Sequence, residues 1–188
     1  MPDPSEIYKQ SIPQLQLLWA EYQESSDRAI CVLAGSLIEP RIEALLAAYL
    51  LDDRVATEEL LPDSQPLGTF SAQTKLAFTL GLITRKDFRR LTLLRKIRNH
   101  AAHKVKVSFT CAPIKDFCAE LGFNETASEL KNSFPAFANA PIEKIALFNF
   151  VSQLVTYLDV WTQIVAEQQR RRELGSYTSS PGKQLGTT

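Results

Sequence analysis

Apolar side chains recur at intervals of three and four residues along almost the whole chain, and this spacing constrains the fold more than any other feature. In the segment 27–51, for example, Ile30, Leu33 and Leu37 belong to one such series. The interval matches the 3.6-residue repeat of an α-helix and gives each helix one apolar face. No stretch alternates apolar and polar residues convincingly as a half-buried strand would, although KVKVSFTC over 104–111 is mildly strand-like. The sequence therefore predicts an all-α protein, a bundle of about four main helices with short accessory helices.

Capping residues mark the ends of these predicted helices. The run Ser25–Asp27 offers N-caps, and Thr84 with Asp87 resembles a weakened capping box. Gly81 is a natural left-handed helix end, whereas Pro40 lies inside a helix and should bend it without breaking it. The predicted helices cover approximately residues 12–24, 27–51, 71–80, 85–102, 113–121, 125–132 and 141–172, with a helical turn near 58–61 and an extended connector over 104–111.

Length and composition place the chain in a broad class. We expect a single domain over residues 1–174 and a disordered tail over 175–188, where the sequence GSYTSSPGKQLGTT is mostly polar. No apolar run approaches the roughly 18 residues of a membrane span, and the N-terminus lacks the features of a secretory signal. The three cysteines, Cys31, Cys111 and Cys118, are irregularly spaced, which favours buried free thiols in a reducing compartment. These features predict a cytoplasmic protein without membrane contacts.

Charge is segregated along the chain although the formal net charge is zero. Residues 1–63 hold 12 acidic and 4 basic residues, whereas residues 85–106 hold nine basic residues against Asp87 alone. Such a basic segment can attract phosphate groups, or it can pack beside the acidic N-terminal helices of its own chain or of a partner. The candidate nucleic-acid-binding residues are Arg95, Lys96, Arg98 and Lys104.

The segment LRKIRNHAAH, residues 94–103, contains both histidines of the chain and three of its basic residues. A histidine can transfer a proton near neutral pH, and an arginine can hold phosphate oxygens and offset the charge of a transition state. An adjacent amide can orient either group. RNA supplies its own 2′-hydroxyl nucleophile, so such a site needs neither a metal nor a protein nucleophile. Arg98, Asn99 and His103 are therefore the candidate catalytic residues.

Helical geometry separates two of these three side chains. Successive residues of an α-helix turn by about 100°, which places His100 at the edge of the buried stripe around Ile97. By the same geometry Arg98 and His103 diverge by about 140°. They can act on one small ligand only if the helix unwinds near residues 101–103 or if two copies of the chain pool their residues.

Other interpretations of these residues stay open. Arg98 can pair with an acidic residue such as Glu39 or Glu43, while His103 caps the end of the helix. A metal site at His100 and His103 lacks a clear third ligand, and the scattered glycines form no phosphate-binding loop. We therefore expect no metal and no cofactor.

Three motifs follow one another in order over residues 35–121. They are an E-x3-E-x-LL pattern that begins at Glu39, the sequence PLGTFSAQTKLAFTLGLI over 66–83, and LRKIRNHAAH followed by PIKDFCAEL. This combination resembles the mannitol operon repressor family. The resemblance implies an all-helical bacterial regulator of transcription that acts through contacts with a protein or a nucleic acid.

The R-N-x3-H arrangement within LRKIRNHAAH also resembles the HEPN domains (higher eukaryotes and prokaryotes nucleotide-binding). Many of these are dimeric ribonucleases in which two such motifs face each other in a cleft. This resemblance implies a HEPN-like fold, a homodimer and an alternative function, a toxin-like endoribonuclease that is independent of metal and uses Arg98, Asn99 and His103. A structural partner of another protein is a third possibility that the neutral net charge fits.

Overall fold

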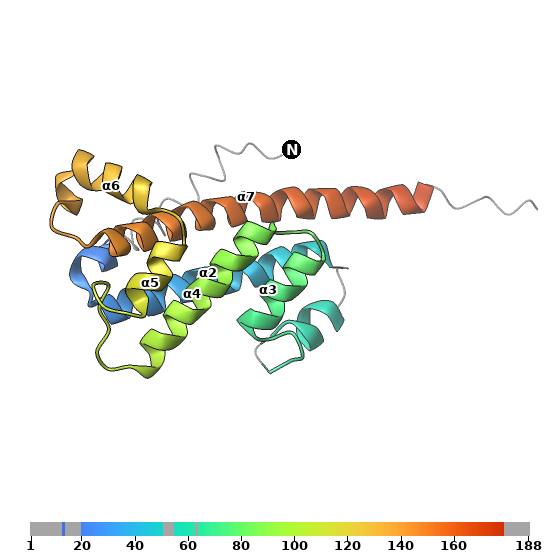
Figure 1. Cartoon of the computed structure of the whole chain (residues 1–188). Coiled ribbons are helices and arrows are strands. Elements are labelled where there is room, and N and C mark those ends of the chain that lie inside the picture. The colour runs from blue at the N-terminus through green and yellow to red at the C-terminus, as the bar shows by residue number, and fades with distance from the viewer. Residues whose placement is uncertain (1–12, 14–19, 51–54, 63, 179–188) are drawn as a thin grey trace, which may run out of the picture.

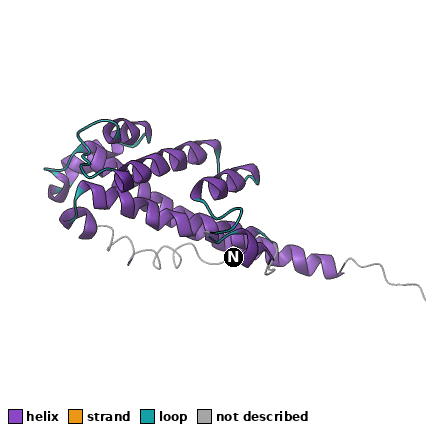
Figure 2. Ribbon diagram, turned by 90° about the horizontal axis from the view of Figure 1, so that it is seen from below, coloured by secondary structure: helices purple, strands orange, loops and turns teal. Residues whose placement is uncertain are grey.

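The protein is described by a computed structural model that covers residues 13, 20–50, 55–62 and 64–178 of the 188-residue chain. All regular elements in these ranges are helical, and Figure 2 shows only helices and loops there. The prediction of an all-α bundle is therefore confirmed. The elements are α2 (Asp27–Tyr49), η1 (Val55–Leu60), α3 (Phe70–Thr79), α4 (Arg85–His103), α5 (Ile114–Glu120), α6 (Asn124–Ser133), η2 (Pro135–Phe137) and α7 (Ile142–Thr178).

The capping residues act as the sequence predicts. Ser26 is the N-cap of α2, and its hydroxyl accepts a hydrogen bond from the first turn. Thr84 and Asp87 form a complete capping box at the start of α4, with both reciprocal hydrogen bonds present. Gly81 follows α3 with a positive φ of 74°, which a residue with a β-carbon rarely adopts. Helix α2 runs through Pro40 without a break, as predicted.

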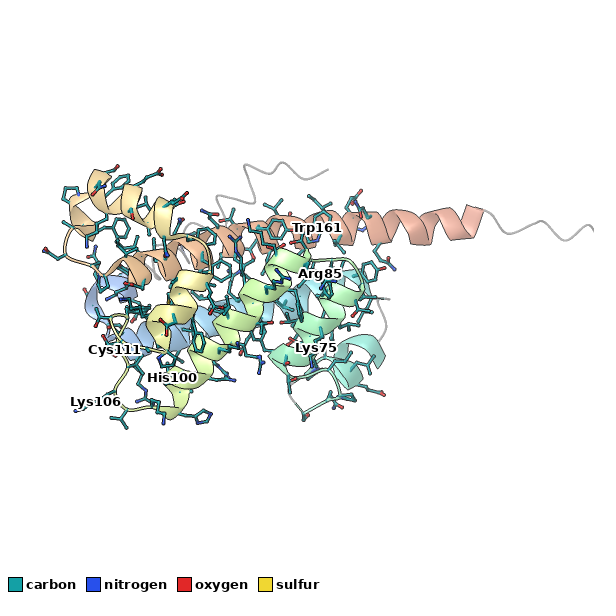
Figure 3. All side chains as sticks on the ribbon, viewed as in Figure 1. Lys75, Arg85, His100, Lys106, Cys111 and Trp161 are labelled. Carbon is teal, nitrogen blue, oxygen red and sulfur yellow. The ribbon has the colours of Figure 1, made fainter. Side chains whose placement is uncertain are left out.

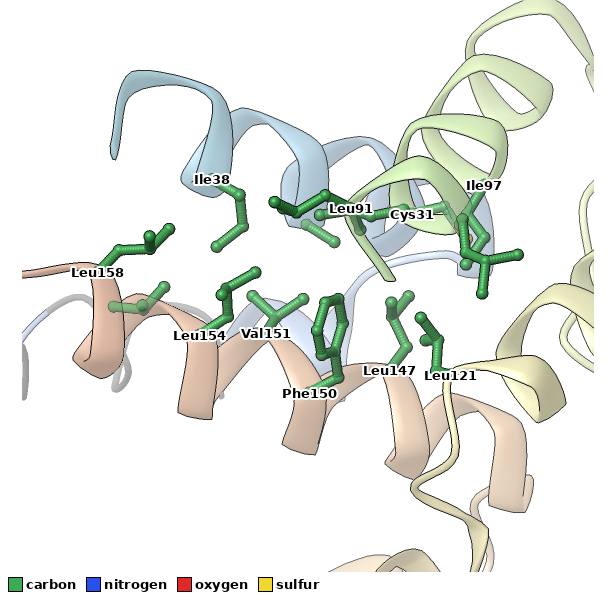
Figure 4. Packing of buried hydrophobic residues seen from close by; sticks show 14 of the residues in the cluster. Cys31, Ile38, Leu91, Ile97, Leu121, Leu147, Phe150, Val151, Leu154 and Leu158 are labelled. Atoms are coloured by element: carbon green, nitrogen blue, oxygen red, sulfur yellow. The ribbon is translucent and has the colours of Figure 1, made fainter. Parts of the chain in front are cut away.

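Helix α7 runs the length of the bundle, and its last turns extend beyond it (Figures 1 and 2). Its apolar face packs against α2 and against residues of α4, where Ile38 of α2 and Leu91 of α4 lie opposite Leu147, Val151 and Leu154 (Figure 4). All five side chains are buried. Because burying one such side chain stabilises a fold by about 1.5–3 kcal/mol, this contact contributes substantially to the cohesion of the bundle.

Polar contacts fix how α7 is placed on the other helices. The guanidinium of Arg41 on α2 donates from Nε to Asp159 on α7 at 2.9 Å. The indole N–H of Trp161 donates to the backbone carbonyl of Leu82, in the turn between α3 and α4, at 2.8 Å. These contacts join α7 both to α2 and to the segment that leads into α4.

Some predicted boundaries and environments differ from the structure. Helix α7 ends at Thr178, so the first residues of the predicted tail are helical, and residues 179–188 lie outside the described residues. The predicted helix over 12–24 is described only at residues 13 and 20–24, which are helical. Cys31 and Cys118 are buried as expected, but the prediction of a buried thiol is wrong at Cys111, which is exposed in the loop after α4. None of the described helices is long and apolar enough to cross a membrane.

Candidate functional site

A cleft of about 660 Å³ lies where α2, α3 and α4 meet. These three helices all contact one another, and Figure 1 shows α3 beside α4 with α2 behind them. The E-x3-E motif, the PLGTFSA motif and the IRN motif each contribute residues, so three segments far apart in sequence form one site. The lining residues are Glu39, Pro40 and Glu43 from α2, Gly68, Thr69, Phe70, Ser71 and Gln73 from the start of α3, and Arg95, Arg98 and Asn99 from α4.

Arg98 is held on the wall of this cleft by contacts with two helices. Its Nη2 lies 3.4 Å from a carboxylate oxygen of Glu39 on α2, and its Nη1 donates to Oδ1 of Asn99 at 3.2 Å. The stem of Arg98 crosses α2 at Gly35, where an added β-carbon would lie 2.6 Å from Cγ of Arg98. Gly35 therefore permits the close approach, and the interpretation in which Arg98 pairs with an acidic residue is confirmed for Glu39.

The end of α4 is regular. The N–H of Lys104 donates to the carbonyl of His100 at 3.1 Å, which completes the last helical turn. Arg28, on the first turn of α2, donates to the carbonyls of Ala101 at 2.9 Å and of Ala102 at 3.3 Å. These carbonyls belong to the last turn of α4, where they have no partner within the helix. The helix does not unwind near residues 101–103, and that interpretation of the histidine motif is wrong.

His103 does not join Arg98 and Asn99 in the cleft. It is the exposed last residue of α4 and is not among the residues that line the cleft. Within the described residues, the side chain of Asn99 bonds to Arg98 and not to His103. In a single chain the three candidate catalytic residues are thus divided between the cleft and the helix end.

A comparison with known protein families finds a match that includes all three helices of the cleft. A family model described as "Mannitol repressor" matches residues 23–165, from just before α2 to near the end of the described core. The match covers well over half of the chain. The chain belongs to the mannitol repressor family. No curated protein and no solved structure was found to match it. The further resemblance to HEPN domains stays a prediction.

In this mannitol repressor family member, the four candidate nucleic-acid-binding residues lie in three different places. Arg95 and Arg98 line the cleft. Lys96 is exposed, with its ammonium nitrogen 5.5 Å from the centre of the Phe117 ring on α5. Lys104 is exposed immediately after α4. The adjacent residues Arg95 and Lys96 thus face different directions, about 100° apart around the axis of α4.

The outer face of α4 carries a row of basic side chains, which we call the basic face and define as Arg85, Arg89 and Lys96. All three are exposed and lie within about 40° of one another around the helix axis. The guanidinium of Arg85 lies 5.1 Å from the centre of the Phe78 ring on α3, and Figure 3 shows Arg85 near the start of α4. Arg85 and Arg89 are not among the residues predicted to bind nucleic acid, although their spacing of four residues in a helix was a signal for a shared face.

The cleft of the mannitol repressor family member also contains residues that sequence reasoning missed. Gln73, which is buried, donates from Nε2 to the carbonyl of Leu61 at 3.0 Å and lies 3.4 Å from a carboxylate oxygen of Glu43. Thr69 caps the first turn of α3 by accepting from the N–H of Ala72 at 3.1 Å. The available sequence signal for a polar cleft at this place was the i, i+4 spacing of Glu39 and Glu43, because such a pair projects from one side of a helix.

Proposed function

We propose that this chain is a regulatory protein that represses genes for the use of a sugar alcohol, as the description of its family indicates, and that it acts by binding another macromolecule. The match to the mannitol repressor family over residues 23–165 carries this proposal. The binding surface is the basic face of α4, which attracts an anionic partner, either the phosphates of a nucleic acid or an acidic protein surface.

The charges of α4 support this role for its outer face. Arg89 is exposed, and within the described residues its guanidinium has no hydrogen-bond or ion-pair partner. Asp87, the acidic residue of α4, is engaged in the capping box with Thr84. The basic face therefore keeps its positive charge available for a partner, although the whole chain has a formal net charge of zero.

The test compares the replacement of one charge on the basic face with the same replacement far from it. Arg89→Glu reverses a charge on α4, and Arg170→Glu reverses an exposed charge on the distal part of α7. In a strain that lacks the chromosomal gene, the wild type and Arg170→Glu should restore repression of the sugar-alcohol genes. Arg89→Glu should not restore it. Equal repression by all three proteins would contradict the role of the basic face.

A binding assay identifies the class of partner. The purified chain is tested by gel shift with promoter DNA from the regulated genes and by pull-down with cell extract, each at several salt concentrations. Binding to DNA should weaken steeply with salt, and Arg89→Glu should lower the slope of log K against log salt by about 1. If neither DNA nor a specific protein binds the wild type, the proposed mechanism is wrong.

A further inference from the structure

We propose that the cleft between α2, α3 and α4 binds a small polyol that carries one phosphate group, of the hexitol phosphate class, as the effector of this regulator. The choice of a hexitol rests on the proposed function. The requirement for a phosphate joined to a polyol rests on the arrangement of charges and of unused hydrogen-bonding groups in the cleft.

Arg95 and the first turn of α3 form the phosphate end of the site. Arg95 lines the cleft and is half-buried, and its guanidinium has no hydrogen-bond or ion-pair partner in the part of the chain that the structure describes. The same wall contains the start of α3, where Thr69 caps the N–H of Ala72 but leaves those of Phe70 and Ser71 without a partner among the described residues. Free N–H groups at a helix N-terminus bind phosphate, and an arginine adds charge-assisted hydrogen bonds.

A buried hydroxyl without a partner lies beside the phosphate end of the cleft and supports the proposal independently. A side pocket of about 170 Å³ shares Ser71 and Arg95 with the cleft and is also lined by Thr74. Thr74 is 4% exposed, and its hydroxyl has no hydrogen-bond partner among the described residues. A buried hydroxyl without a partner costs free energy, so a ligand group that bonds to it from the side pocket gains affinity.

Glu43 and Asn99 form the polyol end. Glu43 meets only the amide of Gln73, at 3.4 Å, and within the described residues its carboxylate has no ion-pair partner. Asn99, which lines the cleft, uses Oδ1 to accept from Arg98, and its amide N–H groups have no partner among the described residues. A polyol hydroxyl both donates and accepts, so it can bond to a carboxylate and to an amide at once.

The charges of the cleft discriminate against longer polyanions. Glu39 neutralises Arg98 at 3.4 Å, so Arg95 is the cation left to meet an anion, while Glu43 adds a negative charge at the opposite wall. A nucleic acid would bring several phosphates near these two carboxylates, whereas a monophosphate presents one anionic group to Arg95. The volume of about 660 Å³ also falls within the range of roughly 300–1,000 Å³ that is typical of small-molecule sites.

The test measures binding to the full chain by isothermal titration calorimetry with three probes, namely mannitol 1-phosphate, mannitol and inorganic phosphate. We expect saturable binding of mannitol 1-phosphate that is about tenfold or more tighter than that of either separate part, because both ends of the site contribute. Binding of inorganic phosphate with equal affinity would overturn the proposal, and so would the absence of binding by the intact ester.

Matched variants assign the contacts. Arg95→Gln should weaken binding of mannitol 1-phosphate by about tenfold or more, and Thr74→Val, which removes a hydroxyl at nearly constant shape, should weaken it as well. Lys86→Gln removes an exposed charge of α4 outside the cleft and outside the basic face, and this variant should bind as the wild type does. Urea unfolding verifies that each variant folds. If Arg95→Gln does not fold, the binding measured for Thr74→Val decides the result.

The outcomes separate this proposal from the proposed function. Equal binding by wild type, Arg95→Gln and Thr74→Val would overturn the effector site. That result would leave the regulatory role intact, since the role depends on Arg89 of the basic face and is measured by repression without any added ligand.

Discussion

Gly35 of α2 and Arg98 of α4 approach so closely that a β-carbon at position 35 would lie 2.6 Å from Cγ and 3.1 Å from Cβ of Arg98. Real β-carbons do not reach 2.6 Å, so one of the two helices has to shift if position 35 gains a side chain. The atoms concerned belong to the stem of Arg98, close to the backbone, and not to its flexible end. This contact therefore sets both the packing of α2 on α4 and the position of the guanidinium in the cleft.

Gly35→Ala should lower the free energy of unfolding. Overpacking costs about 1–3 kcal/mol, and the better helix propensity of alanine offsets about 1 kcal/mol of it, so we expect a net loss of about 1 kcal/mol. Urea unfolding measures the change, with Ser36→Ala on the exposed side of α2 as the control. The double variant Gly35→Ala/Arg98→Ala should lose less than the sum of the single variants, and strict additivity would show that the contact is not the cause.

Arg28→Ala should loosen the end of α4. The variant removes the hydrogen bonds to the carbonyls of Ala101 and Ala102. We expect the free energy of unfolding to fall by only about 1 kcal/mol, because part of the guanidinium is exposed to solvent. Hydrogen exchange should accelerate at the amide of Lys104, which closes the last turn of the helix. Arg170→Ala serves as the control, and unchanged exchange in Arg28→Ala would contradict the capping role.

Trp161→Phe should lower the free energy of unfolding, because it weakens the contact between α7 and the turn that leads into α4. The phenyl ring keeps most of the apolar contact but cannot donate to the carbonyl of Leu82, a residue that is 5% exposed. Leaving a buried acceptor without its donor costs about 1–3 kcal/mol. Chemical denaturation followed by circular dichroism gives the change, and a midpoint equal to that of the wild type would show that the hydrogen bond contributes nothing.

Stability should fall at alkaline pH because of a buried thiol. Burial, and secondarily the charge of Asp27, raises the pKa of Cys31 from 9.0 to about 12. Between these pH values the unfolded chain releases the thiol proton while the folded chain retains it, so stability is fully present below pH 9 and decreases as the pH rises toward 12. Urea unfolding of the wild type and of Cys31→Ala measures this dependence, which should be weaker in the variant.

The reactivity of the thiols provides a control for that prediction. Cys111 is exposed, whereas Cys31 and Cys118 are buried, and burial raises the pKa of both buried thiols. Near neutral pH a thiol reagent should therefore modify Cys111 rapidly and the other two only after unfolding. Rapid modification of all three in the native protein would contradict the buried positions.

The alternative function, RNA cleavage, makes a distinct prediction. Since Arg98 lies in the cleft and His103 at the exposed end of α4, cleavage would need residues from two copies. Arg98→Ala and His103→Ala would then each be inactive on labelled RNA in the presence of a chelator, and mixing them would restore part of the activity. Wild-type protein that leaves the RNA intact, or variants that cleave as well as the wild type, would rule this function out.

Much of the fold could be predicted from the sequence because helices are determined locally. The periodicity around Ile97, the capping box of Thr84 and the left-handed Gly81 depend on residues within one or two turns of each other, and the structure contains all three features. The family could be recognised for a related reason, since its motifs are contiguous segments. The last helix extends past its predicted end because polarity alone does not end a helix.

The candidate site was predicted only in part, because its geometry depends on contacts between distant segments. The sequence indicated that Arg98 could pair with Glu39 or Glu43, because their charges are opposite. It also indicated that Arg98 diverges from His103, which follows from helical geometry. It did not indicate that Gly35 would make room for Arg98, that Arg28 would hold the end of α4, or that Thr74 would line a pocket beside Arg95.

The sequence by itself thus determined the helices, their caps and the faces they bury, since these follow from short-range spacing and capping. Only the tertiary structure decided which polar residues share a cleft. The start of α3 and the middle of α4 are joined through their packing on α2, and packing of helices that lie far apart in sequence leaves no local pattern. Arg95 and Lys96 are adjacent in the chain, yet one faces the cleft and the other the solvent, because α3 covers only one side of α4.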